Sequence, residues 1–192
     1  MLIIKHRVNS IQDLKNTPSH FGVEVDLRAF NEKVILSHDP FISGVEFHEW
    51  LRFYHHQLLI LNVKEDGLEN EILRLLKKNK IDNFFFLDQP FPTIIKTVRE
   101  GCNKIALRYS EYENFLFLKQ MSKTCEWVWV DSFNPYSHDR NVLQAIKELG
   151  YKICMVSSEL QGRNSESERK KISHSSLNIA DAICTKLTDD FL

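Results

Sequence analysis

Several features that define large classes of protein are missing from this sequence. No apolar run approaches the length of a membrane-spanning helix, so we expect no membrane partner. The cysteines lie far apart and form no CxxC pair, which argues against structural zinc and a thioredoxin-like redox site. We expect reduced thiols in the core at all four positions: Cys102, Cys125, Cys154 and Cys184.

A surplus of charge of one sign is missing as well. The chain has 25 basic and 26 acidic residues and a formal net charge of -1. Its one conspicuous basic block, at positions 169–171, is too short to argue for nucleic acid, so we expect no nucleic-acid partner. An apolar run starts at once in residues 1–5 and leaves no room for a signal peptide before His6, so we expect a cytoplasmic protein.

Short apolar runs recur along the whole chain. They are nearly continuous and rich in Ile, Val, Leu and Phe, as expected for strands that are covered on both faces. At 192 residues we expect one domain spanning residues 1–192, with a single core. The predicted strands are Leu2–Lys5, Gly22–Leu27, Leu58–Val63, Asn83–Leu87, Lys104–Leu107, Trp127–Val130, Lys152–Val156 and Asp181–Cys184.

Helical periodicity separates several of these runs. Leu68, Ile72, Leu75 and Leu76 form one apolar stripe, and a second stripe ends just before Gly150, a residue suited to a helix C-terminus. Repeated βα units imply a parallel sheet, and eight strands close a TIM-type barrel. The sequence therefore predicts an α/β fold, a compact (β/α)8 barrel with shortened helices, because the fold typically needs about 250 residues. An open doubly wound sheet is the alternative, but no Gly-rich phosphate loop supports it.

Acidic and apolar residues alternate around Glu24 and Asp26, so a strand would project both carboxylates to the same side. Two like charges so close are costly unless a cation lies between them or one takes a proton. Hard divalent cations prefer oxygen ligands of this kind. His6 and His38 flank the pair in sequence and have the side chain best suited to proton transfer near neutral pH.

Together these residues resemble the N-terminal signature of the glycerophosphodiester phosphodiesterases and their phosphatidylinositol phospholipase C-like relatives. That signature has His-Arg-Gly after the first barrel strand, Glu-x-Asp on the second, His-Asp on a following hairpin and Glu-x-Lys on a later strand. This chain matches it with His6-Arg7, Glu24/Asp26, His38-Asp39 and Asn62-Val63-Lys64. It departs from it at Val8, in place of the glycine, and at Asn62, in place of the third metal-binding carboxylate.

The resemblance implies a role for each matching residue. Glu24, Asp26 and Asn62 would hold a divalent metal, Mg²⁺ in the first place and Ca²⁺ as the alternative. His6 and His38 would be the acid and base. Arg7 and Lys64 would bind the phosphate. Arg108 is not part of the signature; it ends a predicted strand, where a barrel carries its functional groups, and we assign it to the phosphate as well, although a surface ion pair is an equally good interpretation. Asp88 either supplies the carboxylate that position 62 lacks or, as we favour, forms a turn before Gln89-Pro90.

The predicted function is metal-assisted cleavage of a small glycerol- or sugar-linked phosphodiester by a pair of histidines. The expected partner is therefore a small-molecule phosphodiester. Two alternatives stay open because of Asn62. The chain could be a catalytically weakened barrel that binds a phosphorylated ligand, or it could catalyse a phosphotransfer or lyase step in polysaccharide or lipid-precursor metabolism.

Overall fold

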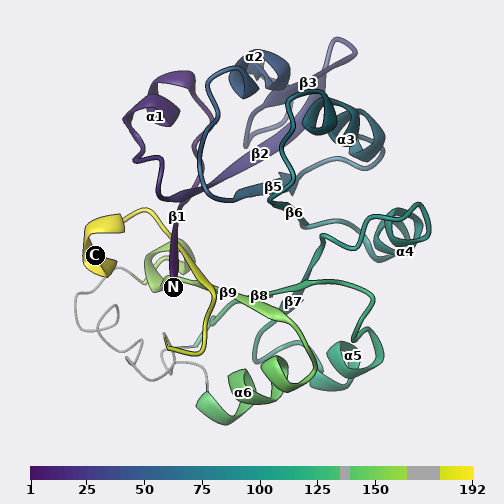
Figure 1. Ribbon diagram of the computed structural model, residues 1–192, viewed down its shortest axis with the longest axis vertical. Coiled ribbons are helices and arrows are strands. Elements are labelled where there is room, and N and C mark those ends of the chain that lie inside the picture. The colour runs from purple at the N-terminus through teal and green to yellow at the C-terminus, as the bar shows by residue number, and fades with distance from the viewer. Residues whose placement is uncertain (135–138, 164–177) are drawn as a thin grey trace. The chain divides into compact units, whose positions relative to one another are not determined.

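The computed structural model describes residues 1–134, 139–163 and 178–192 (Figure 1). The basic block at positions 169–171 lies outside these ranges. All eight predicted strands form, namely β1 (Leu2–Lys5), β2 (Gly22–Phe30), β5 (Leu59–Val63), β6 (Phe84–Leu87), β7 (Ala106–Tyr109), β8 (Trp127–Val130), β9 (Lys152–Val156) and β10 (Ala182–Thr185). Two short strands that the sequence did not predict, β3 (Lys33–Leu36) and β4 (Val45–Glu46), follow β2.

Short helices connect the strands. They are α1 (Ile11–Asn16), α2 (Phe47–Leu51), α3 (Glu69–Lys78), α4 (Phe91–Arg99), α5 (Phe115–Gln120) and α6 (Arg140–Glu148). The predicted stripe is the buried face of α3, where Ile72, Leu75 and Leu76 all lie in the core. Gly150 follows α6 with φ +92°, a backbone conformation that glycine adopts without steric cost. Within the described ranges, no helix has the length and apolarity needed to cross a membrane.

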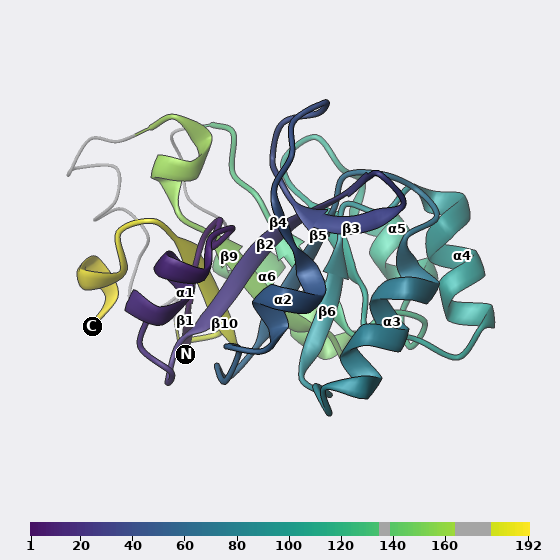
Figure 2. The same cartoon turned by 90° about the horizontal axis from the view of Figure 1, so that it is seen from above.

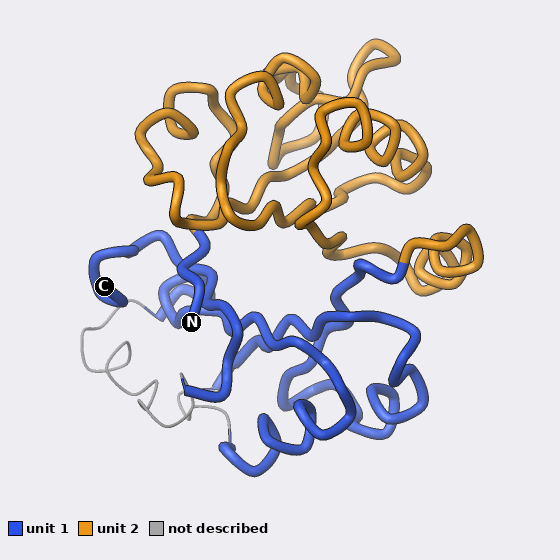
Figure 3. Tube along the Cα trace, in the orientation of Figure 1, with its two compact units in different colours: residues 1–4, 103–192 blue, residues 5–102 orange. Residues whose placement is uncertain are grey.

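The chain divides into two compact units (Figure 3). One comprises residues 5–102, and the other combines residues 1–4 with residues 103–192. A single domain spanning residues 1–192 stays a prediction.

The unit of residues 5–102 contains a sheet in the order β4-β3-β2-β5-β6. β2, β5 and β6 are parallel, and β2 forms an antiparallel hairpin with β3. Helices α1, α2 and α3 lie on one face of these strands (Figures 1 and 2). The register places Asp26 beside Asn62, so polar residues of two neighbouring strands meet on one face, and it places the apolar Leu87 on the other side of Asn62.

In the second unit, β7, β8, β9 and β10 form consecutive parallel pairs, and β1 follows β10 in the order. Helices α5 and α6 lie on one face of these strands (Figures 1 and 2). Two single-turn 3-10 helices follow strand ends, Ser158–Gln161 after β9 and Thr188–Phe191 after β10.

The central strands are buried on both faces, as their apolar composition predicts. All five residues of β5 are buried, and Val23, Val25 and Leu27 of β2 are fully inaccessible. The two acidic residues of β2 are buried as deeply as these apolar ones. Carboxylates are rarely placed in such positions unless other groups compensate their charge.

Candidate active site

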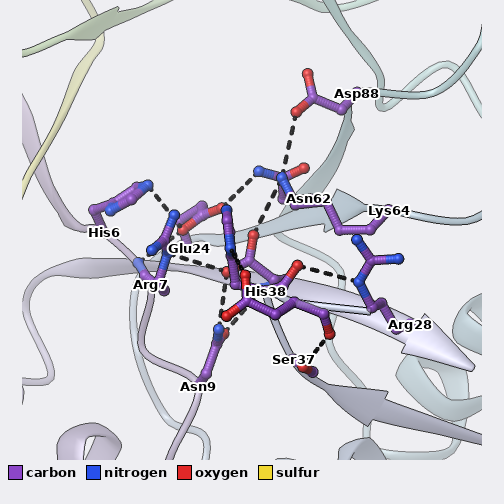
Figure 4. Close-up of polar contacts among 12 residues, drawn as sticks. His6, Arg7, Asn9, Glu24, Arg28, Ser37, His38, Asn62, Lys64 and Asp88 are labelled. Carbon is purple, nitrogen blue, oxygen red and sulfur yellow. Dashed lines mark hydrogen bonds and ion pairs between the residues drawn. The ribbon is translucent and has the colours of Figure 1, made fainter. Parts of the chain in front are cut away.

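Glu24 and Asp26 project from the same face of β2, as their spacing predicts. Their relative accessibilities are 0% and 1%, so both carboxylates have lost their hydration. The two carboxylates contact side chains and a backbone N–H from the loop after β1, from the end of β5 and from the residue after it. Figure 4 shows this arrangement.

Glu24 accepts hydrogen bonds from two groups. Asn62 Nδ2 donates to Oε1 at 2.9 Å, and the backbone N–H of Arg7 donates to Oε2 at 2.7 Å. The imidazole Nε2 of His6 lies 3.7 Å from Oε2. Burial, and then the neighbouring charge of Asp26, raise the pKa of Glu24 to about 7, although Asn62, the Arg7 N–H and Lys64 partly oppose the rise. The charge of Glu24 is therefore only partly compensated by the groups around it.

Asp26 lies beside two cationic side chains, Arg7 and Lys64. Asn9 Nδ2 donates to Oδ2 at 2.8 Å, and Arg7 Nε lies 3.4 Å from the same oxygen. Lys64 Nζ lies 3.3 Å from Oδ1. The backbone N–H of Asp26 also donates to Asn9 Oδ1 at 2.9 Å. Sequence reasoning missed Asn9, whose only signal was its place three residues after His6 in the same loop.

The loop after β1 is held by backbone contacts. Val8 N donates to Glu24 O at 2.8 Å, and Val8 O accepts from the indole Nε1 of the buried Trp50 at 3.1 Å. The Val8 side chain is fully buried, so the residue that stands in place of the family glycine is part of the core. Arg7 adopts φ +57°, a strained conformation for a non-glycine residue. In this conformation the Arg7 backbone N–H donates to Glu24 and the Arg7 guanidinium forms an ion pair with Asp26.

The hairpin of β2 and β3 brings His38 to the same end of the sheet. Ser37 N, next to His38, donates to the backbone oxygen of Asp26 at 3.1 Å. Nδ1 of His38 lies 2.8 Å from Asp39 Oδ1, and this hydrogen bond holds the pKa of Asp39 below its usual value. Arg28 Nε donates to His38 O at 3.1 Å. With Nδ1 engaged, the ring presents Nε2 for proton exchange.

Lys64 follows β5 and is anchored by its backbone N–H, which donates to Leu27 O at 3.0 Å. Its ammonium lies between two carboxylates, 3.3 Å from Asp26 Oδ1 and 3.7 Å from Asp88 Oδ2 (Figure 4). Asp88 follows β6 and has φ +65°. Its side chain therefore contributes to the site as well as to the predicted turn.

The donor set around Glu24 fits a hard divalent cation. It offers two buried carboxylates and the amide of Asn62, whose Oδ1 is buried and accepts no hydrogen bond. Carboxylate and amide oxygens are the ligands that Mg²⁺ and Ca²⁺ prefer. Across the described ranges, no group of three or more His, Cys, Asp or Glu side chains is arranged to hold a metal ion. Glu24 and Asp26 are the two carboxylates in this donor set, and Asn62 supplies an amide in place of a third.

Arg108 belongs to the other unit, at the end of β7. Its guanidinium pairs with Asp131, which is 2% accessible and also accepts from Gln161 Nε2. The ion pair considered for Arg108 is thus present. The other seven predicted site residues all lie in the unit of residues 5–102. Their assigned roles stay predictions.

Comparison with known proteins then gives the fold. No family model and no curated protein matches the sequence. A solved glycerophosphoryl diester phosphodiesterase from Parabacteroides distasonis is similar, with a TM-score of 0.72 and 14% identity over 98% of this chain and 84% of that one. A solved glycerophosphodiester phosphodiesterase from Agrobacterium tumefaciens is also similar. Its TM-score is 0.70, and its sequence identity is 9% over 100% of this chain and 98% of that one.

The chain has the fold of these phosphodiesterases. The predicted α/β fold of the TIM-barrel type is confirmed, and the likeness covers nearly the whole chain. Phosphoribosyl anthranilate isomerase from Thermus thermophilus is more distant, with a TM-score of 0.51 and 11% identity over 96% of this chain and 86% of that one. One fold hosts many activities, so function must be argued from the site.

Proposed function

We propose that this protein cleaves a small glycerol- or sugar-linked phosphodiester with the help of a divalent cation. The observation that carries the proposal is the pair of buried carboxylates, Glu24 and Asp26, surrounded by His6, Arg7 and Lys64. A core strand would gain stability from apolar residues at these two positions. Costly polar groups gathered at one strand end are typical of an active site.

Glu24, Asp26 and the amide oxygen of Asn62 would hold the cation, with Mg²⁺ favoured over Ca²⁺. A bound divalent ion polarises a phosphoryl oxygen and neutralises charge that develops in the transition state. The raised pKa of Glu24 supports this assignment, because a carboxylate whose charge is only partly compensated gains most from a nearby cation. Asn62 is neutral, so the cage carries less negative charge than one with three carboxylates.

His6 and His38 would move the protons. A hydroxyl beside the phosphate loses its proton to one imidazole and attacks phosphorus, and the bond to the leaving oxygen breaks. The other imidazole gives its proton to that oxygen, so an alcohol and a cyclic phosphate result. Water, deprotonated by one imidazole, then attacks phosphorus and opens the ring, and the released hydroxyl oxygen takes a proton from the other imidazole. The hydrogen bond between His38 and Asp39 supports this role, because it fixes the orientation of the imidazole.

Arg7, Lys64 and Arg108 would bind the non-bridging oxygens of the phosphate. Lys64 and Arg7 have the stronger support because both already contact the buried carboxylate of Asp26.

Turnover of glycerophosphocholine with Mg²⁺ tests this function, because this diester carries a glycerol hydroxyl beside the phosphate, as the proposed step requires. His38→Ala should reduce turnover by about 10²- to 10⁴-fold, the usual contribution of a general acid or base. His48→Ala is the matched control, since His48 is half-exposed and pairs with Glu46 and Glu49. Equal loss in both variants, or no turnover by the wild type with any divalent ion, would contradict the proposal.

A binding protein is the second candidate, and Asn62 is the observation that favours it. The Asn62 amide donates to Glu24, the contact that opposes the rise in its pKa most strongly, and so supplies part of the charge compensation that a cation would otherwise provide. Binding of glycerol phosphate without turnover of any diester would support this alternative. A lyase or phosphotransferase is the third candidate. A cyclic phosphate as the final product, analysed by phosphorus NMR, would distinguish the lyase from the hydrolase.

A further inference from the structure

Lys64 has two acidic partners of different character. Asp26 is 1% accessible and lies 3.3 Å from the ammonium, whereas the Asp88 side chain is 23% accessible and lies 3.7 Å away. Asp26 also belongs to the proposed cation site, and Asp88 does not. The Lys64 ammonium is therefore shared between Asp26, which would be a ligand of the cation, and Asp88, which would not be one.

The backbone of Asp88 turns its side chain toward this position. The sheet register pairs Leu87 with Asn62, and the next residue of a regular strand would point to the opposite face. Asp88 instead has φ +65°, a conformation that aspartate and asparagine tolerate better than most residues. With this backbone conformation the Asp88 carboxylate lies beside Lys64 (Figure 4), whose ammonium also contacts Asp26.

A divalent cation at Asp26 would conflict with Lys64 at its present position. The ammonium and the cation would both bind the carboxylate of one buried aspartate, where the low dielectric strengthens their repulsion. A neutral Asn62 makes the conflict worse, because no third carboxylate adds negative charge. Either the cation binds weakly, or Lys64 leaves Asp26.

We propose that Lys64 leaves Asp26 and pairs with Asp88 alone when a cation binds to Asp26. The inference rests on the proposed cation site and adds Asp88 to it as a positioning residue. The exchange frees Asp26 for the cation. It also keeps the ammonium beside the site, where the phosphate oxygens would bind.

Calorimetric titration with Mg²⁺ and Mn²⁺ tests the exchange through affinity alone, without an activity assay. Asp88→Asn should weaken binding by about tenfold, within the range of coupling between residues in one charge network. Lys64→Met should strengthen binding, because the competing ammonium is gone. In the Lys64→Met background, Asp88→Asn should then change the affinity by less than about twofold, since no lysine remains to be positioned.

Glu65→Gln is the matched control. Glu65 also follows β5, but it pairs with Arg28 at 3.2 Å, so removing its charge should leave Mg²⁺ affinity unchanged. Asparagine tolerates a positive φ as aspartate does, so Asp88→Asn should retain the native circular dichroism spectrum.

The outcomes separate this inference from the function beneath it. If Asp26→Asn abolishes binding while Asp88→Asn has no effect, the cation site stands and the exchange is wrong. If Asp88→Asn weakens binding equally with and without Lys64, Asp88 is a direct ligand and the exchange is again wrong. If the wild type binds none of Mg²⁺, Mn²⁺ and Ca²⁺, both the cation site and the exchange are wrong.

Discussion

Asn9 and Asp26 hold each other through both ends of the asparagine side chain. Asn9 Nδ2 donates to the Asp26 carboxylate at 2.8 Å, and Asn9 Oδ1 accepts from the Asp26 backbone N–H at 2.9 Å. The loop after β1 is thereby tied to β2 at the residue that the proposed cation needs. The backbone contact holds Asn9 against β2, and the side-chain contact orients the Asp26 carboxylate.

Asn9→Ala should loosen this attachment. Each hydrogen bond to a charged group contributes about 1.5–3 kcal/mol, so we expect a loss of roughly 2 kcal/mol in the free energy of unfolding. Mg²⁺ affinity should also fall, because Asp26 can then rotate. Urea denaturation and calorimetry measure the two effects. Asn16→Ala is the control, since the exposed Asn16 side chain accepts its hydrogen bond from the exposed Gln12, at 3.1 Å. Unchanged affinity in Asn9→Ala would show that Asn9 does not position the ligand.

Glu24→Gln should stabilise the metal-free protein, and the gain should depend on pH. The pKa of Glu24 is raised from 4.5 to about 7 in the folded state, so the ionised form is disfavoured by folding. Ionisation of Glu24 therefore lowers the free energy of unfolding. This destabilisation is absent below pH 4.5, grows as the pH rises toward 7 and reaches its full size above pH 7. The neutral variant should therefore gain up to about 3 kcal/mol over the wild type at pH 8, and little at pH 4.5.

Glutamine suits this test because Asn62 can turn its amide so that Oδ1 accepts from the new side chain, while the Arg7 N–H still finds an oxygen. Denaturation in EDTA across this pH range measures the difference. A gain that does not vary with pH would mean that Glu24 is ionised throughout the range or that another group compensates its charge.

Asn62→Glu restores the third carboxylate of the family. Because Asn62 Nδ2 lies 2.9 Å from Glu24 Oε1, the change places a negative charge against an already disfavoured one. Without metal the variant should be less stable by about 1–3 kcal/mol, and with Mg²⁺ it should bind the ion more tightly. We expect diester turnover by the natural reaction to fall, as in an enzyme adapted to a less charged cage. Higher turnover together with tighter binding would indicate a weakened phosphodiesterase instead.

Trp50→Phe should disturb the site from a distance. The indole N–H donates to Val8 O at 3.1 Å, and its loss leaves a buried carbonyl without this partner at a cost of about 1–3 kcal/mol. The loop that carries His6, Arg7 and Asn9 should then loosen, and Mg²⁺ affinity should fall. Trp129→Phe removes the same volume from a buried position in the other unit and should leave that affinity unchanged. Equal Mg²⁺ affinities in both variants would show that Trp50 does not affect the cation site.

The sequence predicted the strands well because each is a continuous apolar run bounded by polar residues. Even the acidic pair of β2 was predictable, since alternation alone puts Glu24 and Asp26 on one face. It missed β3 and β4, which are too short for a periodic signal. The fold class followed from counting these runs, and the similar solved structures confirm it.

Tertiary contacts decided the rest. Asn9 carries no local signal, and only the loop that Trp50 holds brings it to Asp26. The exposed Asp39 and the buried Glu24 are carboxylates of the same chemistry, yet their pKa values shift in opposite directions because one faces a histidine in water and the other lies in the core. Asp88 looked like a turn former from its neighbours in sequence, and its contact with Lys64 depends on a backbone angle and a sheet register. Periodicity and residue type are local and can be read along the chain. Burial, charge compensation and side-chain direction depend on residues distant in sequence, so they exist only in the folded protein.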